Sequence, residues 1–311
     1  MEGGNDTVVR EFLLSGLTDI PELKIPLFLV FLIVYLITIV GNIGIILLIH
    51  IDPRLHTPMY YFISHLAFID VCYSSTITPK MLSDLLAEKK SISVTGCLTQ
   101  LSSFSLFATT ESILLALMAF DRYLAICRPL HYMLIMAKEV CMWSVVGVYA
   151  ASLVTSVINL GFTFMLSFCG PNKIRHFFCD FMALYKLSCT DTWVNEMLVF
   201  TSSALITMGA ILIILSSYTS ILGAVLKIRS VTGRSKVIST CASHFLCVVI
   251  FYGTLIFMYV RPNSSHSQDQ DFVASVFYAV IIPMLNPLIY SLRNESVKNA
   301  LKMIRHNKIF C

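Results

Sequence analysis

Five long stretches of this chain, each of 21 to 30 residues, contain no Asp, Glu, Lys or Arg. The hydrocarbon core of a bilayer is about 30 Å thick, and about 20 apolar residues in a helix cross it with every backbone polar group paired inside the segment. A chain that is 57% hydrophobic and 13% charged is therefore expected to cross a membrane repeatedly. The uncharged stretches are 25–49, 140–168, 197–226, 237–260 and 272–292.

Two further apolar segments carry charges, namely Asp70 and Lys80 in one and Glu111 in the other. We expect both segments to cross the membrane, with these charges in the interior of the bundle or at the end of a span. The prediction is an all-α membrane protein, a single seven-helix domain over 1–311. The expected spans are 25–49, 58–81, 98–120, 140–162, 197–226, 237–260 and 272–292.

Basic residues are unevenly distributed between the loops. If the N-terminus is outside, the cytoplasmic segments hold 13 Lys and Arg against 4 Asp and Glu, a net charge of +9, whereas the whole chain has +4. Short cytoplasmic loops carry an excess of Lys and Arg, so we expect 1–24 outside the cell and 293–311 in the cytosol. Residues 1–24 lack the apolar core of a cleavable signal peptide. The small net charge gives no argument for a nucleic-acid partner.

Modification sites follow from this orientation. Asn5 begins the sequon Asn5-Asp6-Thr7 on the expected outer side, and we predict that it is glycosylated, whereas Asn263 lies too close to the membrane. Four cysteines face the oxidising side, where disulfides persist, and four thiols allow three pairings. They are Cys97, Cys169, Cys179 and Cys189.

After the last span, Val297, Leu301 and Ile304 recur at helical spacing with basic residues between them. This pattern predicts a short amphipathic helix on the inner leaflet. The alternative is a frayed tail.

Asp70 and Glu111 are candidate functional residues, because a charge inside a span costs several kcal/mol. If the second and third spans pack together, the two carboxylates could share Na⁺ or a proton, with oxygen atoms from Asn42, Ser112 and Asn286 completing the shell. The alternative is a protonated carboxyl pair that makes hydrogen bonds between helices.

The tripeptide Asp121-Arg122-Tyr123 lies at the inner end of the third span. A guanidinium there offers a rigid set of donors to a partner's backbone carbonyls, and the neighbouring acid can pair with it in a resting state.

Pro287 interrupts the seventh span in Asn286-Pro287-Leu288-Ile289-Tyr290. Proline removes a helical hydrogen bond and kinks the helix, and Asn286 can satisfy a freed carbonyl. A kinked span with Tyr290 one turn below is a candidate moving part, although static proline kinks are also common.

A set of longer motifs makes the chain resemble one family. They are LHTPMYYF (55–62), PKML (79–82), MAFDRYLAICRPLHY (118–132), SY (217–218), KVISTCASHF (236–245), FYGT (251–254) and PMLNPLIYSLRN (283–294), with FCGPNKIRHFFCD (168–180) and LSC (187–189) in the long loop. In this order they resemble the vertebrate olfactory receptors of the group for airborne odorants, a branch of the rhodopsin-like (class A) G protein-coupled receptors.

The resemblance implies a rhodopsin-like bundle with disulfides Cys97–Cys179 and Cys169–Cys189. It also implies an odorant cavity in the outer half, between spans 3, 5, 6 and 7 and under the long loop. Apolar walls with a few hydroxyls suit a small, mostly apolar volatile. The lining that it predicts, of which we expect about half to touch ligand, is Phe104, Ser105, Ala108, Thr109, Ser202, Ser203, Ile206, Tyr252, Leu255, Tyr259, Val276 and Ala279.

The chain lacks the Trp and Pro of the sixth span found in most rhodopsin-like receptors, with Tyr252 and Gly253 there instead. Arg175 stands where the family usually has Asn and adds a charge near the expected mouth of the cavity. That charge could favour polar or anionic odorants or simply be solvated. Other departures are Phe120, Ala67 and Ala183.

The function that the resemblance implies is an odorant receptor in the plasma membrane of olfactory cilia, which activates a stimulatory, olfactory-type G protein and raises cyclic AMP. Odorant binding would shift the population toward an arrangement with an open cytoplasmic cleft that accepts a helix of the G protein. Arg122, Tyr218, His244 and Tyr290 would rearrange. Flanking basic residues would contact either the G protein or anionic membrane lipid. They are Lys227, Arg229, Arg234 and Lys236.

Other function classes are weaker. The sequence shows no catalytic constellation, so we expect neither an enzyme nor a required cofactor, and a metal site at His176, Cys179 and Asp180 fails if Cys179 is in a disulfide. A transporter or channel would need ionisable residues along most of the bundle. A rhodopsin-like receptor for a non-odorant ligand shares every mechanical motif and stays open as an alternative.

Overall fold

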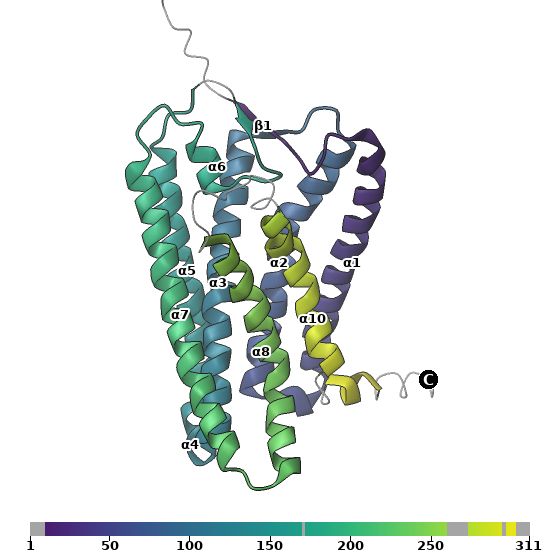
Figure 1. The fold of residues 1–311 in the computed structure, drawn as a ribbon, viewed down its shortest axis with the longest axis vertical. Helices are drawn as coiled ribbons and strands as arrows, with labels where there is room; N and C mark the ends of the chain where they lie inside the picture. The colour runs from purple at the N-terminus through teal and green to yellow at the C-terminus, as the bar shows by residue number, and fades with distance from the viewer. Residues whose placement is uncertain (1–9, 170–171, 260–272, 294–296, 303–311) are drawn as a thin grey trace, which may run out of the picture.

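A computed structural model describes residues 10–169, 172–259, 273–293 and 297–302. Over these residues the chain forms a bundle of seven long helices that run between two ends (Figure 1). This arrangement confirms the predicted all-α fold. The first six long helices are α1 (Pro21–Ile51), α2 (Pro58–Leu86), α3 (Val94–Cys127), α5 (Lys138–Phe164), α7 (Trp193–Lys227) and α8 (Val231–Tyr259). The seventh begins at Val273, contains the π-turn η3 (Phe277–Ile281) and ends with α10 (Ile282–Arg293).

Six of the seven helices are long and apolar enough to cross a membrane by themselves, and α2 is the exception. In α2, 16 of 29 residues are buried, Asp70 among them, whereas in α1 only six of 31 are buried. Helix α2 packs against α1, α3 and α10, and Asp70, Ser74, Thr78 and Asp84 are buried there. A helix shielded in this way does not need an apolar surface toward lipid.

The helices extend beyond most of the predicted spans, because hydrophobicity marks only the part of a helix that lies in hydrocarbon. Helix α3 begins at Val94, where the Ser93 hydroxyl caps it by accepting a hydrogen bond from the Gly96 amide at 3.0 Å. Helix α8 begins at Val231, within the expected cytoplasmic loop. Residue 260, the predicted end of the sixth span, lies outside the described residues.

Helices α1 and α10 approach closely at Gly41. A Cβ atom placed on Gly41 would lie 3.2 Å from Cγ of Pro287. The missing side chain therefore makes room for the proline ring. Beyond α10, residues 297–302 are helical, with Val297 and Ala300 buried and Leu301 exposed. Ile304 and Arg305 of the predicted amphipathic helix lie outside the described residues.

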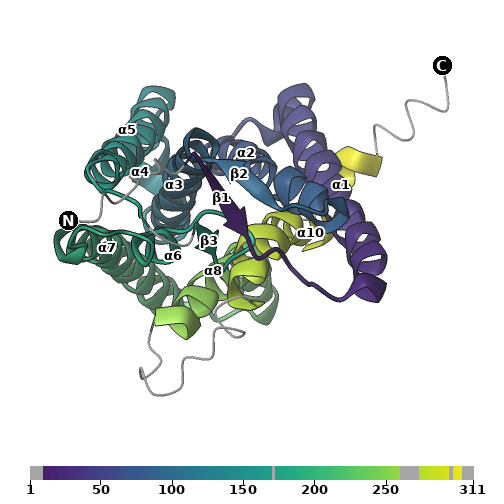
Figure 2. The same ribbon diagram turned by 90° about the horizontal axis from the view of Figure 1, so that it is seen from above.

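A three-stranded sheet covers one end of the bundle (Figure 2). Its central strand β1 (Glu11–Leu14) pairs antiparallel with β2 (Ser91–Ser93) and parallel with β3 (Lys173–Ile174). The Phe12 side chain of β1 is fully buried and packs edge-to-face on Phe168, with the ring centroids 5.5 Å apart. The N-terminal segment, which we expected only as an extracellular extension, is therefore part of this cover in its described residues.

The loop between α5 and α7 contributes the remainder of the cover through β3 and the short helix α6 (Phe181–Tyr185). We call β1, β2 and the described residues 165–169 and 172–192 of this loop the lid. At the opposite end lie η1 (Pro53–Leu55), between α1 and α2, and α4 (Pro129–Ile135), between α3 and α5.

Candidate functional site

A cavity of about 150 Å³ lies between α3, α5, α7, α8 and the π-turn segment, directly beneath α6. Helix α6 begins at Asp180, whose carboxylate caps it by accepting hydrogen bonds from the amides of Met182 and Ala183 at 3.0 and 3.3 Å. The cavity is lined by Phe104, Ser105, Ala108, Thr109, Ser112, Thr155, Asn159, Asp180, Phe181, Met182, Val199, Ser203, Ile206, Thr207, Phe251, Leu255, Ser275 and Tyr278.

Seven of the twelve predicted residues line this cavity, and four others, whose side chains are also described, do not. Tyr259 is outside the residues whose side chains are described. The seven are Phe104, Ser105, Ala108, Thr109, Ser203, Ile206 and Leu255, and the four are Ser202, Tyr252, Val276 and Ala279.

The π-turn accounts for the two misplaced residues of the last span. Counting back from Pro287 with α-helical spacing predicted Val276 and Ala279, but Phe277–Ile281 forms a π-turn, which changes the register of the residues before it. Ser275 and Tyr278 line the cavity in their place, and Ala279 is fully buried in the apolar core.

The other two predicted residues outside the cavity wall, Tyr252 and Ser202, use their hydroxyls in hydrogen bonds to backbone carbonyls. The Tyr252 hydroxyl donates to the Ser112 carbonyl at 2.9 Å and also contacts the Ser112 hydroxyl at 3.0 Å, so it joins α8 to α3. Ser202 is one residue from Ser203, which is a rotation of about 100° on a helix. Its hydroxyl donates to the Val199 carbonyl at 3.2 Å and accepts from the Asn159 amide at 3.5 Å.

Sequence reasoning also missed several other lining residues. On helices that were predicted to line the cavity these are Ser112, Val199, Thr207 and Phe251, and Asp180 precedes α6. Thr155 and Asn159 come from α5, and Phe181 and Met182 come from α6. The aromatic residues of the long loop were the available signal for the residues of α6. Arg175, the unusual charge of that loop, is exposed and does not line the cavity.

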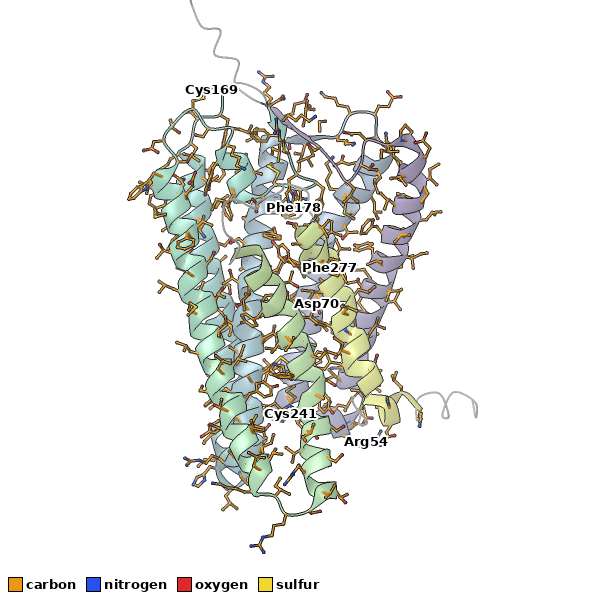
Figure 3. All side chains as sticks on the ribbon, viewed as in Figure 1. Arg54, Asp70, Cys169, Phe178, Cys241 and Phe277 are labelled. Atoms are coloured by element: carbon orange, nitrogen blue, oxygen red, sulfur yellow. A yellow bond between two sulfur atoms is a disulfide. The ribbon has the colours of Figure 1, made fainter. Side chains whose placement is uncertain are left out.

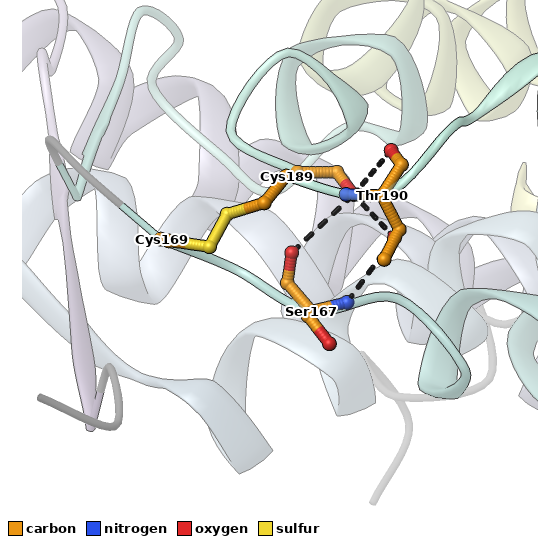
Figure 4. Close-up of a disulfide and its surroundings, with 5 residues drawn as sticks. Ser167, Cys169, Cys189 and Thr190 are labelled. Atoms are coloured by element: carbon orange, nitrogen blue, oxygen red, sulfur yellow. Dashed lines mark hydrogen bonds between the residues drawn. A yellow bond between two sulfur atoms is a disulfide. The ribbon is translucent and has the colours of Figure 1, made fainter. Parts of the chain in front are cut away.

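Two disulfides hold the lid. Cys97 at the start of α3 is bonded to Cys179, with Cα atoms 5.4 Å apart, and Cys169 is bonded to Cys189, with Cα atoms 5.7 Å apart (Figure 4). These are the pairs that the resemblance implied. The Cys189 amide also donates to the Ser167 carbonyl at 2.9 Å. Since Cys179 is in a disulfide, it supplies no thiolate to a metal with His176 and Asp180.

Asp70, Glu111 and Asn286 meet in the middle of the bundle (Figure 3 labels Asp70). The Asn286 amide nitrogen lies 3.2 and 3.0 Å from the two Asp70 carboxylate oxygens and 3.4 Å from Oε1 of Glu111. All three side chains are buried, and they join α2, α3 and α10.

Asn42 and Ser112, which we expected to complete an oxygen shell, have other hydrogen-bond partners in the structure. The Asn42 amide donates instead to the carbonyls of Thr38 and Pro283, at 2.9 and 3.0 Å, and Ser112 pairs with Tyr252. Within the described part of the chain, no group of three His, Cys, Asp or Glu residues could hold a metal ion. Two carboxylates and one amide remain as the centre.

Asp121 is paired differently from the expected resting-state ion pair. Its carboxylate accepts a hydrogen bond from the Tyr132 hydroxyl of α4 at 2.9 Å, and among the described residues no ion pair joins it to Arg122. Burial, together with the neighbouring Asp121, raises the pKa of Tyr132 well above its ordinary value of 10.0. The phenol therefore stays protonated and keeps donating to Asp121.

His244 links three helices near the inner end. Its Nε2 lies 3.1 Å from the Leu115 carbonyl of α3, and its Nδ1 lies 2.7 Å from the Tyr218 hydroxyl of α7. A carbonyl only accepts, so Nε2 carries the proton and Nδ1 accepts from the tyrosine. Tyr290 of α10 is also buried, and Tyr123 of α3 is half-buried.

Comparisons with known proteins identify similar sequences. The family model described as "Olfactory receptor" matches residues 31–308. The mouse protein "Olfactory receptor 8U3" is 53% identical over 298 residues, which cover 96% of this chain and 93% of that protein. The human protein "Olfactory receptor 5G3" is 54% identical over 310 residues, which cover 100% and 99% of the two chains.

Proposed function

Because the chain belongs to the olfactory receptor family, whose members are receptors of the membrane and not enzymes, we propose that it binds a small volatile odorant in the cavity beneath α6. Odorant binding then activates a stimulatory, olfactory-type G protein and raises cyclic AMP. The observation that carries this proposal is the cavity itself, since it lies in the half of the bundle where the family resemblance predicts the odorant. One protein domain over 1–311 performs both binding and signalling.

The orientation proposed here places the lid outside the cell and α4 in the cytosol. One disulfide lies within the lid and the other joins the lid to the start of α3, and disulfides persist on the oxidising side of a membrane. The protein is accordingly a plasma membrane receptor, expected in the cilia of olfactory neurons. Asn5, the proposed glycosylation site, lies on the same side but outside the described residues.

The G protein would bind at the inner end, where α4 presents apolar side chains. Leu130 is 93% exposed, and Met133 and Leu134 are also exposed. Apolar side chains at this boundary suit a helix-in-groove contact with a protein partner. Lys227, Arg229 and Arg234 are exposed nearby and would contact either the partner or anionic lipid, whereas the side chain of Lys236 is outside the described residues.

Signal transmission is proposed as a population shift. An odorant that binds the active arrangement more tightly favours separation of the inner ends of α7 and α8, and so breaks the bond between Tyr218 and His244. Arg122 is then available to the partner, and Tyr290 of α10 repacks.

The buried centre formed by Asp70, Glu111 and Asn286 is proposed to hold a proton or Na⁺ shared between the two carboxylates. This arrangement gathers both charges at one point, whereas a transporter would distribute ionisable residues along a path.

A cyclic AMP reporter assay in cells, run with a panel of volatiles, tests the proposal. Arg122→Ala is expected to lose the response at equal surface level, because the guanidinium donors to the G protein are gone. Lys186→Ala, which removes an exposed charge from the lid, is the control and should respond as the natural chain does. The proposal fails if well-surfaced receptor answers no volatile, or if Arg122→Ala responds fully.

A further inference from the structure

We propose that the cavity selects neutral odorants with a hydroxyl group, that is small alcohols or phenols, over ethers, aldehydes, acids and hydrocarbons of the same shape. The inference rests on the proposed function, since it takes the cavity beneath α6 as the odorant site. It is carried by unpaired hydrogen-bonding groups on one wall of the cavity.

The polar residues are unevenly distributed around the cavity. The wall formed by α3, α5 and α7 carries most of the hydroxyls and the amide of Asn159. The wall formed by α8 and the π-turn segment is mainly apolar and aromatic, with Phe251, Leu255 and Tyr278. Figure 2 shows α5 and α7 on one side of the bundle, away from α10. A ligand with one polar end and an apolar body matches this division.

Four hydroxyls of the polar wall have no hydrogen-bond partner among the described residues, whereas many other hydroxyls of the bundle do. Elsewhere Ser and Thr side chains donate to the carbonyl one turn back, as Thr110, Ser152 and Thr163 do at 2.7 to 2.9 Å. By contrast, four lining hydroxyls make no hydrogen bond to any described residue, although three of the four residues are half-buried and Ser203 is exposed. The four are Ser105, Thr109, Ser203 and Thr207.

Asn159 adds an acceptor that needs a donor. The Ser202 hydroxyl has one hydrogen, and it donates that hydrogen to the Val199 carbonyl. Ser202 can therefore only accept a hydrogen bond from Asn159, so the amide nitrogen of Asn159 is the atom that faces Ser202. The carbonyl oxygen Oδ1 of Asn159 is buried and has no partner among the described residues. Leaving a buried acceptor unpaired is unfavourable, so a ligand O–H that donates gains affinity where an ether or aldehyde oxygen does not.

Charged odorants do not fit this lining. No Lys, Arg or His is among the described lining residues, so a carboxylate would lose its hydration without a cation to replace it. Asp180 is the only acidic residue there, and its carboxylate already caps α6.

The size of the cavity limits the apolar body. Its volume of about 150 Å³ equals that of the engineered cavity, about 150 Å³, that holds benzene in another protein. One ring or a short chain therefore fills the space.

The test is the cyclic AMP assay with matched probes, using full-length receptor and normalising to surface level. The hydroxyl probes are benzyl alcohol, phenol and short primary alkanols. Each is compared with its methyl ether, with the hydrocarbon that lacks the hydroxyl, and, where they exist, with the corresponding aldehyde and acid. We expect responses to alcohols or phenols at concentrations at least about ten-fold below those of the matched ethers, from the free energy of one hydrogen bond.

Variants locate the effect. Thr207→Val and Thr109→Val keep the side-chain shape and should each raise the half-effective alcohol concentration about three- to ten-fold. Thr207→Ser should restore most of the potency. Thr219→Val on the same helix α7 is the matched control, because its hydroxyl is exposed and already donates to the Leu215 carbonyl at 2.8 Å.

The outcomes separate the two proposals. Responses that are equal for alcohols and ethers, or alcohol potency that is unchanged in both valine variants, would overturn the inference while leaving the receptor function intact. Silence toward every volatile in well-surfaced receptor would overturn the proposed function, and the inference with it.

Discussion

At the lid end of the bundle, two disulfides and a three-stranded sheet join the helices, whereas at the opposite end α7 and α8 meet through the hydrogen bond between Tyr218 and His244. A disulfide typically contributes about 2–4 kcal/mol to stability, and a neutral hydrogen bond contributes about 1 kcal/mol. The inner end is also packed through a small apolar cluster of Ile221, Val225 and Cys241, so it is held by non-covalent contacts, whereas the lid end is joined covalently as well.

This difference fits the two tasks of a receptor. A cavity whose lid is fixed before the ligand arrives loses little conformational entropy on binding. An inner end that is held weakly can change its arrangement when a ligand supplies a few kcal/mol of differential affinity. Five experiments, in order of decreasing expected effect, test this contrast.

The largest effect is expected for Cys97→Ala. It removes the covalent bond between α3 and the lid, which closes a separation of 82 residues. Receptor at the cell surface should fall to background, measured by antibody labelling of intact cells. Cys72→Ala, at a free and half-buried cysteine of α2, is the control and should keep most surface receptor. Normal surface level and response in Cys97→Ala would remove the basis for calling the lid end rigid.

At the inner end, Tyr218→Phe should raise cyclic AMP in the absence of odorant. Loss of about 1 kcal/mol shifts the equilibrium toward separated inner ends about five-fold. Surface level should not change, in contrast to Cys97→Ala. The control is Tyr35→Phe, which removes a hydrogen bond of 3.0 Å to Ser75 between α1 and α2. An unchanged or lower basal signal in Tyr218→Phe would mean that this bond does not hold the inner ends together.

Lys90→Met should loosen the N-terminal strand without unfolding the bundle. The Lys90 ammonium donates to the carbonyls of Ser15 and Thr18 at 3.0 and 2.9 Å and to the Asp19 carboxylate at 2.7 Å. Hydrogen exchange of the Leu13 and Leu14 amides should become about ten-fold faster, as expected for the loss of roughly 1.4 kcal/mol. Lys89→Met removes an exposed pair with Glu11 and should leave exchange nearly unchanged.

The same contact has a defined pH dependence. Hydrogen bonding and charge attraction from Lys90 lower the pKa of Asp19 below its ordinary value of 3.8. Because the pKa is lower in the folded state, the stabilisation is present at pH values above 3.8 and is lost as the pH falls through the folded pKa. Exchange protection of β1, corrected for the intrinsic rate, should therefore be constant from neutral pH to about pH 4. A loss of protection near pH 6 would point to a different group.

The smallest effect is expected for Asp52→Asn in the short loop after α1. Its carboxylate accepts from the Arg54 guanidinium at 2.9 and 2.5 Å, and this contact lowers the pKa of Asp52 to about 2. The Arg54 side chain is exposed, so loss of this ion pair should change neither the surface level of the receptor nor the odorant dose–response curve. A large loss of signalling would show that the inner end also depends on a fixed loop.

Apolar length and charge pattern were sufficient to predict the helices, and the family resemblance predicted seven of the residues that line the cavity. Apolar length placed the spans, and Asp70 and Glu111 correctly marked a buried centre because charges in hydrocarbon require a partner. Ser203 and Ile206 followed from helical spacing measured from nearby motifs. Each of these inferences used residues within a few turns of one another.

The errors arose where structure departs from regular spacing or depends on distant residues. A π-turn of five residues moved Val276 and Ala279 out of the wall and brought in Ser275 and Tyr278. Strand β1 could not be predicted because its partners, such as Ser91 and Lys173, are about 80 and 160 positions away. The role of Asn42 depended on the carbonyl of Pro283, which is 241 positions away.

The position of β1 in the lid also bears on how the protein is made. This strand is the first described element to be synthesised, yet its neighbours in the sheet, β2 and β3, lie after the second and fourth long helices. Such long-range pairing closes slowly. The sheet is therefore complete only after β3, which lies more than half of the way along the chain, has been translated. An enzyme that attaches a sugar near the strand would have access to it before that point.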